Sequence, residues 1–285
     1  MQEPVASHHR QELIEQHTMD NPRRYAHPVI KAALLTLAAS FTLAGCVSTL
    51  PPEGQKKVEP EIFEQKNLEI AHGFLQQGYP QRAISRLEEI LKVNRQSART
   101  YGMLGVVYQS QGEYDLAEKN FVRSLDIDSD ASDVRNNFGV LLYTTGKYDQ
   151  ARKQFELATD DIYYDNRSRA FENLGFVSLQ TGDREEARQL FKRALRLDQN
   201  LVRASLELTD MFHEDGNFVE SERYFQNYQR LTQNSRPSPR ALLLGIELAR
   251  VFRQENRLAD YADQLTRFYP GSAEYRKYQA SLRND

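Results

Sequence analysis

The chain has 285 residues, of which 37 are basic and 40 are acidic, so its formal net charge is −3. A mildly acidic and evenly mixed surface argues against a nucleic-acid partner, which requires a basic face or stripe. The single cysteine excludes an internal disulfide and a thiol-rich metal site.

The N-terminal segment, residues 1–45, has the pattern of a secretory signal. Basic residues Arg23, Arg24 and Lys31 precede the uncharged run Ala32–Leu43. That run is shorter than the roughly 20 residues of a membrane span, which disfavours the alternative of a short spanning helix. Residues 1–18 contain three glutamates, which a signal does not carry at its start, so we expect translation to begin at Met19.

The signal ends in Leu43-Ala44-Gly45-Cys46, which resembles the bacterial lipobox. The resemblance implies that Cys46 is acylated and becomes the mature N-terminus; the alternative is an ordinary signal with a chance cysteine. Val47 and Ser48, with no aspartate directly after Cys46, favour release to the outer membrane. The polar, proline-containing residues 46–63 are predicted to be the acylated N-terminus and a flexible tether.

After the tether, the chain repeats with a period of about 34 residues. A small residue recurs at intervals of 34, 34, 36, 34 and 40, as Ala71, Gly105, Gly139, Gly175, Thr209 and Ala249. Seven positions later comes a residue suited to a tight turn, namely Gly78, Gly112, Gly146, Gly182, Gly216 and Asn256.

Each copy also predicts a second close contact between helices. A second small residue follows twelve positions after the first in five copies, as Ala83, Ala117, Ala151, Ala187 and Ser221, whereas Tyr261 breaks the pattern. A bulky residue follows four positions later, as Leu87, Phe121, Phe155, Phe191, Phe225 and Leu265. Small residues facing bulky ones let antiparallel helices approach closely, and each pair leaves an apolar face that the next pair covers.

These positions resemble the tetratricopeptide repeat, with its Leu-Gly-x-x-Tyr at Leu104, Gly105 and Tyr108 and its Ala-x-x-x-Phe at Ala117–Phe121. The resemblance implies an all-α fold, a right-handed superhelix (α-solenoid) of six helix-turn-helix repeats over residues 64–275. The predicted copies are 64–97, 98–131, 132–167, 168–201, 202–235 and 242–275, with a C-terminal helix end at 276–285. Two interruptions of the period predict loops at Asp160–Asp165 and Asn234–Pro239.

Residues for catalysis or metal binding do not gather in any recognisable motif. Once the signal is removed, the remaining histidines, His72 and His213, stand 141 positions apart. The run Asp126–Asp130 resembles the opening of a calcium loop, but Ala131 stands where glycine is needed and Asn137 where glutamate is needed. We therefore expect no enzymatic activity, no metal and no cofactor.

The first helix of each repeat is expected to line the concave side of the superhelix. The predicted partner-binding groove consists of Val106, Gln109, Asn136, Val140, Tyr143, Phe176 and Leu179. The alternative is that some of these side chains contact the next repeat instead. The tetratricopeptide grooves that hold a C-terminal carboxylate use Lys and Asn at these rows, and the first row here lacks both. An apolar peptide is therefore the expected ligand.

The order of lipobox, tether and six repeats resembles the pilotins, the PilF/PilW group of type IV pilus biogenesis lipoproteins. This resemblance implies an outer-membrane lipoprotein on the periplasmic face that helps the pilus secretin reach that membrane and multimerise. The residues alone indicate a lipid-anchored helical-repeat adaptor for proteins, with no nucleic-acid or small-molecule ligand. The alternative is a lipoprotein scaffold for outer-membrane protein assembly or for cell-wall enzymes.

Overall fold

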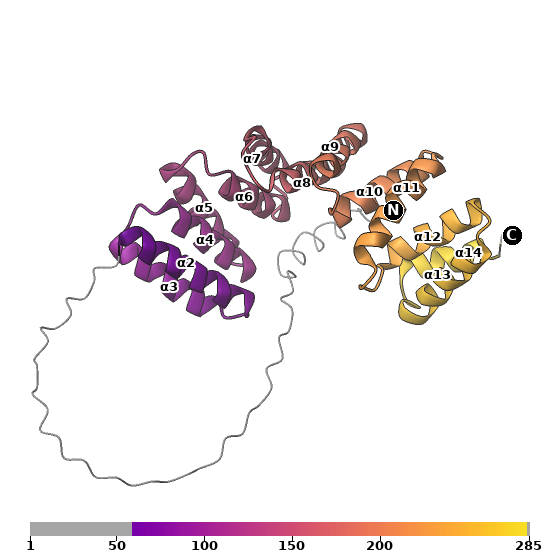
Figure 1. Cartoon of the computed structure of the whole chain (residues 1–285), viewed down its shortest axis with the longest axis horizontal. Helices are drawn as coiled ribbons and strands as arrows, with labels where there is room; N and C mark the ends of the chain where they lie inside the picture. The colour runs from indigo at the N-terminus through magenta and orange to yellow at the C-terminus, as the bar shows by residue number, and fades with distance from the viewer. Residues whose placement is uncertain (1–58, 284–285) are drawn as a thin grey trace, which may run out of the picture.

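A computed structural model describes residues 59–283 of the chain. Its α-helices follow one another in antiparallel pairs along a curved row (Figure 1). The pairs are α2 (Pro60–Gln76) with α3 (Pro80–Val93), α4 (Ala98–Ser110) with α5 (Tyr114–Ile127), and α6 (Ser132–Thr144) with α7 (Tyr148–Asp160). They continue with α8 (Arg167–Gln180) and α9 (Arg184–Leu197), α10 (Val202–Glu214) and α11 (Phe218–Thr232), and α12 (Pro239–Val251) and α13 (Glu255–Phe268). Helix α14 (Ala273–Ser281) follows the last pair.

A glycine in the left-handed backbone region ends the first helix of each of the first five pairs. At Gly112 the φ angle is 77°, and the backbone N–H of Glu113 closes the turn on the carbonyl oxygen of Tyr108 at 3.0 Å. Glycine reaches this conformation without a steric penalty, so one short turn can reverse the chain. The turn positions predicted in these five copies are confirmed, at Gly78, Gly112, Gly146, Gly182 and Gly216.

The predicted close contacts between paired helices are also confirmed in the second, third and fourth pairs. A Cβ atom added to Gly105 would lie 2.6 Å from the Phe121 ring, and Gly139 and Phe155 repeat that contact at the same distance. Ser221, which takes the place of the second small alanine, is fully buried and donates a hydrogen bond to the carbonyl oxygen of Thr209 at 2.7 Å. The absence of a side chain on one helix therefore makes room for a ring on the other.

The first helix begins earlier than predicted, because α2 starts at Pro60, inside the segment expected to be the tether, 46–63. Proline is favoured in the first turn of a helix, where its missing N–H would have no partner and its fixed φ angle already suits the helix. The proline taken as a sign of tether is thus the start of the repeat domain. Residues 46–58 of the predicted tether, Cys46 included, and the predicted signal 1–45 lie outside the described residues.

The sixth repeat has a different register from the predicted one. Its left-handed turn residue is Arg253, with φ 54°, whereas the predicted turn residue Asn256 lies inside α13. The close contact is made by Gly245, whose added Cβ would lie 2.8 Å from the ring of Tyr261. Tyr261 is therefore the bulky partner of this copy, and the break in the pattern of second small residues falls at Arg257.

In that copy, two pairs of residues have the spacing of a small residue and its bulky partner on the facing helix. Ala249 and Leu265 are both fully buried and have the same spacing as Gly245 and Tyr261, one helical turn further on. The periodicity of the sequence favours the later pair, which places the small residue 40 positions after Thr209. The structure places it 36 positions after, so the insertion before α12 is shorter than predicted.

The buried side chains form three successive cores along the row of helices. One core joins α2, α3 and α4, a second extends from α5 to α11, and a third extends from α10 to α14. Helix α14 covers the exposed end of the last pair through Tyr278, and Ser281 accepts a hydrogen bond from Arg250 of α12 at 2.9 Å. Contacts therefore run between neighbours, as repeat packing requires.

Candidate partner-binding site

The predicted groove residues divide into a partly exposed group and a buried group. Val106, Gln109 and Leu179 are partly exposed. The four buried residues have exposed fractions of 4% at Asn136 and 1% at each of Val140, Tyr143 and Phe176. The structure therefore leaves three of the seven side chains within reach of a partner.

The buried group packs against side chains of its own repeat and of the neighbouring one. The side-chain amide of Asn173, on α8, donates to the Asn136 oxygen on α6 at 3.0 Å and so joins two first helices. The Tyr143 ring meets the edge of Tyr148 at 5.5 Å, and the Phe176 ring meets Phe191 at 5.0 Å.

The predicted strip of Asn136, Val140, Tyr143 and Phe176 is therefore buried in this structure, and its contacts with a partner stay a prediction. The three apolar side chains belong to the core that extends from α5 to α11. A side chain with 1% of its surface exposed has almost no area left for a partner. Partner contacts by Val106, Gln109 and Leu179 stay a prediction.

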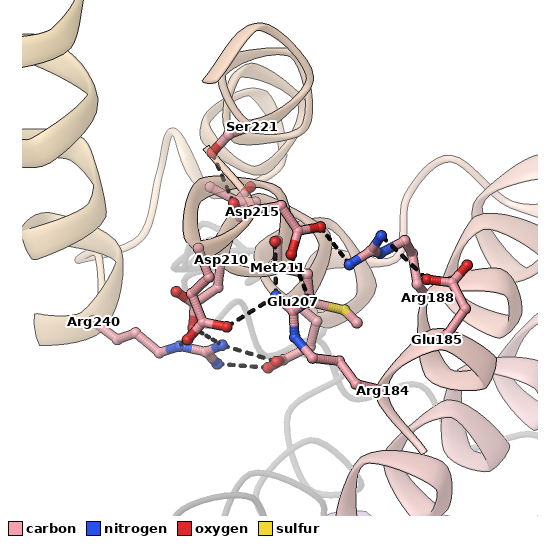
Figure 2. Close-up of polar contacts among 11 residues, drawn as sticks. Arg184, Glu185, Arg188, Glu207, Asp210, Met211, Asp215, Ser221 and Arg240 are labelled. Carbon is pink, nitrogen blue, oxygen red and sulfur yellow. Dashed lines mark hydrogen bonds and ion pairs between the residues drawn. The ribbon is translucent and has the colours of Figure 1, made fainter. Parts of the chain in front are cut away.

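A cluster of charges joins the fifth pair to the sixth. Figure 2 shows Arg240 of α12 reaching Glu207 and Asp210 of α10. The Arg240 nitrogens lie 2.6 and 2.8 Å from the two Glu207 oxygens, and Nε donates to Asp210 at 3.0 Å. Burial by itself would lower the pKa of Arg240, but the two carboxylates outweigh it and hold that pKa well above its ordinary value.

A second cluster joins the fourth pair to the fifth. Arg184 of α9 donates to Asp215 at 2.7 Å and to the carbonyl oxygen of Met211 at 2.8 Å, and Arg188 pairs with the same aspartate (Figure 2). These charges are paired within the protein, so they fix one repeat on the next and leave little charge for a ligand. Sequence reasoning missed both clusters, although the paired residues are separated in the sequence by about the length of one repeat.

A titratable contact lies beside the first cluster. His213 of α10 and Glu247 of α12 approach to 3.6 Å. Burial raises the pKa of the Glu247 carboxyl above its ordinary range, and the charge of Asp210 adds to this effect. His213, Lys277 and Arg250 act in the opposite direction.

The first pair carries a hollow of about 510 Å³ between α2 and α3. Its lining combines two aromatic rings, two arginines and three further polar side chains, namely Phe63, Phe74, Arg82, Arg86, Asn67, Ser85 and Glu89. Two large apolar side chains of α2, Ile62 and Ile70, are 47% and 44% exposed. The hollow therefore brings two aromatic rings together with two arginines and one glutamate.

Sequence reasoning missed this hollow because it assigned Phe63 to the tether. The available signal was the 4-3-4 spacing of Phe63, Asn67, Ile70 and Phe74, which lie along one face of a helix.

The tetratricopeptide repeat family matches residues 96–161, 130–200 and 177–239. Over 253 residues the chain is 36% identical to the type IV pilus assembly protein PilF of Pseudomonas aeruginosa, which covers 88% of this chain and 98% of that protein. The chain belongs to the PilF family.

Two solved structures agree with this assignment. A structure of Pseudomonas aeruginosa PilF is similar with a TM-score of 0.75 and 34% identity, covering 78% of this chain and 99% of that one. The structure of PilW, described as a widely conserved type IV pilus biogenesis factor, has a TM-score of 0.64 and 23% identity. The match covers 75% of this chain and 97% of the PilW chain. The second similarity shows the fold alone.

As a PilF homologue built from tetratricopeptide repeats, the chain belongs to a family of non-enzymatic, protein-binding repeat proteins. The all-α superhelical fold predicted from the repeat is confirmed. Across residues 59–283, no helix combines the length and the apolar character needed to cross a membrane.

Proposed function

We propose that this PilF-family chain is an outer-membrane lipoprotein, a pilotin, that binds the type IV pilus secretin and promotes its localisation and multimerisation. The observation that carries the proposal is 36% identity over 88% of the chain to a type IV pilus assembly protein. The Leu43–Cys46 lipobox supports a lipid anchor, and Val47 and Ser48 support an outer-membrane destination facing the periplasm.

The hollow between α2 and α3 supports the docking of an apolar segment of the secretin. Phe63 and Phe74 supply aromatic surface, and aromatic side chains usually dominate the energetics of protein interfaces. Arg82, which also lines the hollow, lies 4.9 Å from the Tyr79 ring centroid and 5.8 Å from that of Phe74. This pair is the first after Cys46, so its partner would be held close to the anchored end.

The test is complementation of a deletion strain with two matched variants. Phe74→Asp places a charge in the hollow and is expected to weaken secretin capture roughly tenfold or more. Val219→Asp, at a 72% exposed position of α11, is the control and is expected to behave as the unaltered protein. The readouts are secretin co-purification and secretin multimers in outer-membrane fractions, with the melting temperature measured for each variant.

Normal secretin multimers in the outer membrane of the deletion strain would overturn the proposal. Co-purification of outer-membrane assembly subunits or cell-wall enzymes in place of the secretin would instead support the scaffold alternative. Equal secretin capture by a folded Phe74→Asp variant and by the control would remove the hollow from the docking site while leaving the pilotin role intact.

A further inference from the structure

The two ends of the row of helices differ in how they are covered. Helices α2 and α14 lie at opposite ends of the row (Figure 1). Helix α14 packs on the last pair through the buried side chain of Tyr278. At the other end, α2 carries Ile62 and Ile70, which are 47% and 44% exposed. The outer faces of terminal repeats are ordinarily polar, so exposed apolar side chains there indicate a surface that a partner covers.

These two isoleucines belong to one side of α2, which we call the α2 outer face. It consists of Ile62, Lys66, Ile70 and Gly73, spaced by four, four and three residues, and this spacing aligns them along the helix. A Cβ atom added to Gly73 would meet nothing within 4 Å. The α2 outer face therefore combines two apolar side chains, one cation and an open notch.

The same positions in the next four repeats show what packs on such a face. Ile70 comes directly before the small residue of its repeat, and its four equivalents are at most 7% exposed, namely Leu104, Phe138, Leu174 and Leu208. The equivalents of Lys66 and of Gly73 are buried too, as Thr100, Val134, Ala170 and Ala204, and as Val107, Leu141, Val177 and Met211. The first repeat thus exposes a face that the next four repeats bury.

A helix of the preceding repeat packs on this face in the later copies. The second helix of each pair contacts the first helix of the next, as α3 does with α4 and α5 with α6. The ring of Phe138, the equivalent of Ile70, lies 5.8 Å from the ring of Phe121 on α5. Within residues 59–283, no helix lies on α2 as α5 lies on α6. The neighbour that suits the α2 outer face is therefore an α-helix.

Charge indicates the chemistry of that helix. Lys66 is exposed and lies one helical turn from each isoleucine. Arg82 and Arg86, with one opposing Glu89, line the adjoining hollow. A symmetric contact between the α2 outer faces of two copies would bring Lys66 close to its own counterpart, because it lies midway between Ile62 and Ile70. A helix with acidic residues beside its apolar side chains avoids this repulsion.

We propose that the α2 outer face binds an amphipathic α-helix of the secretin, with apolar side chains about one turn apart and an acidic residue opposite Lys66. This helix takes the place on α2 that α5 takes on α6. The inference rests on the proposed pilotin role for the identity of the partner, and it specifies the conformation and charge of the docked segment. Phe63 and Phe74 lie beside Ile62 and Ile70, so the same helix reaches the hollow.

The test maps the partner residues that lie opposite the two ends of this face. The photocrosslinking amino acid p-benzoylphenylalanine replaces Ile62, Ile70 or Gly73 in the full-length protein, in cells that contain the secretin. Mass spectrometry identifies the crosslinked residues. Positions 62 and 73 are about 16 Å apart along α2, at about 1.5 Å per residue. A helical partner spans that distance with about eleven residues and an extended one with about five.

We expect secretin adducts from all three positions, with the residues that react at positions 62 and 73 about eleven apart. Val219, 72% exposed on α11, is the control position and is expected to give no secretin adduct. Adducts about five residues apart, adducts with a second copy or with residues 46–58 of the same chain, or no adduct while the secretin co-purifies would overturn the inference. These outcomes leave the pilotin role intact. Normal secretin multimers without the protein would overturn both proposals.

Charge-altering variants test the same face without a crosslinker. Ile70→Asp is expected to weaken secretin co-purification roughly tenfold or more, and Lys66→Glu roughly threefold or more. The matched controls are Val219→Asp and Lys119→Glu, at exposed positions of α11 and α5, and both are expected to bind as the unaltered protein. Melting temperatures verify that each variant folds. Unchanged co-purification with folded Ile70→Asp and Lys66→Glu variants would overturn the inference.

Discussion

The closest contacts in the array are made by single glycines lying under aromatic rings. A Cβ atom on Gly139 would lie 2.6 Å from the Phe155 ring, which is itself fully buried. We expect Gly139→Ala to lower the free energy of unfolding by about 1–3 kcal/mol, because the ring must move against its packed surroundings. Urea unfolding of the purified variant measures this change.

Gly73 is the control for that substitution. It also lies inside a helix, α2, but an added Cβ atom would meet nothing within 4 Å. Because alanine is the better helix former, Gly73→Ala is expected to raise the free energy of unfolding by about 0.5–1 kcal/mol. Changes of the same sign at Gly73 and Gly139 would contradict the packing described for the repeat.

The Glu247 carboxyl predicts that the free energy of unfolding depends on pH. Its pKa is raised in the folded protein by burial and by Asp210, so the folded state binds a proton more tightly there than the unfolded state does. The contribution of Glu247 to stability is therefore fully present at acidic pH and is lost as the pH rises through the raised pKa. Glu247→Gln removes this titration.

The measurement is urea unfolding of both proteins from acidic to neutral pH. We expect the glutamine variant to gain stability relative to the unaltered protein as the pH rises, and the difference to level off above the raised pKa. A difference that shrinks with rising pH would mean that the contact with His213 outweighs burial and Asp210.

At the scale of helices and turns, the sixth repeat differs from the other five. Arg253 has φ 54°, where the equivalent Gly216 has φ 71°. A side chain in this region is strained by roughly 1–2 kcal/mol. Arg253→Gly is therefore expected to stabilise the protein slightly and Gly216→Ala to destabilise it, as thermal melting of each variant would show. Destabilisation by both substitutions would indicate that the Arg253 side chain makes contacts worth more than the strain.

The sequence predicts those features of the helices that depend on residues near one another in the chain. Gly139 and Phe155 are 16 positions apart on adjoining helices, so their pairing recurs with the period and is visible without a structure. The register of the sixth repeat is not determined in this way, because Gly245–Tyr261 and Ala249–Leu265 satisfy the same spacing.

The candidate site was less predictable than the helices. Tyr143 and Phe176 stand on rows predicted to face a ligand, but packing in the core from α5 to α11, which depends on the angle between successive pairs, buries both. The pairing of Arg240 with Glu207 depends on the same angle.

At the scale of the whole molecule, the proposed lipobox would make Cys46 responsible for the location of the protein. Cys46→Ser is expected to abolish acylation, since a serine offers no thiol for the lipid, and to leave the protein in the periplasm or as an unprocessed precursor. Incorporation of labelled palmitate measures this directly. Ser48→Ala is the control and is expected to stay labelled. Continued labelling of the Cys46→Ser variant would show that the lipobox interpretation is wrong.

The three successive cores have a consequence for how the molecule melts. Because side chains of α2 and α14 share no core, loss of one end does not by itself expose the other. Such arrays lose cooperativity as they lengthen, so the van't Hoff enthalpy of melting should fall below the calorimetric enthalpy. A ligand bound between α2 and α3 would then delay the melting of the first core while the later transitions stay where they were.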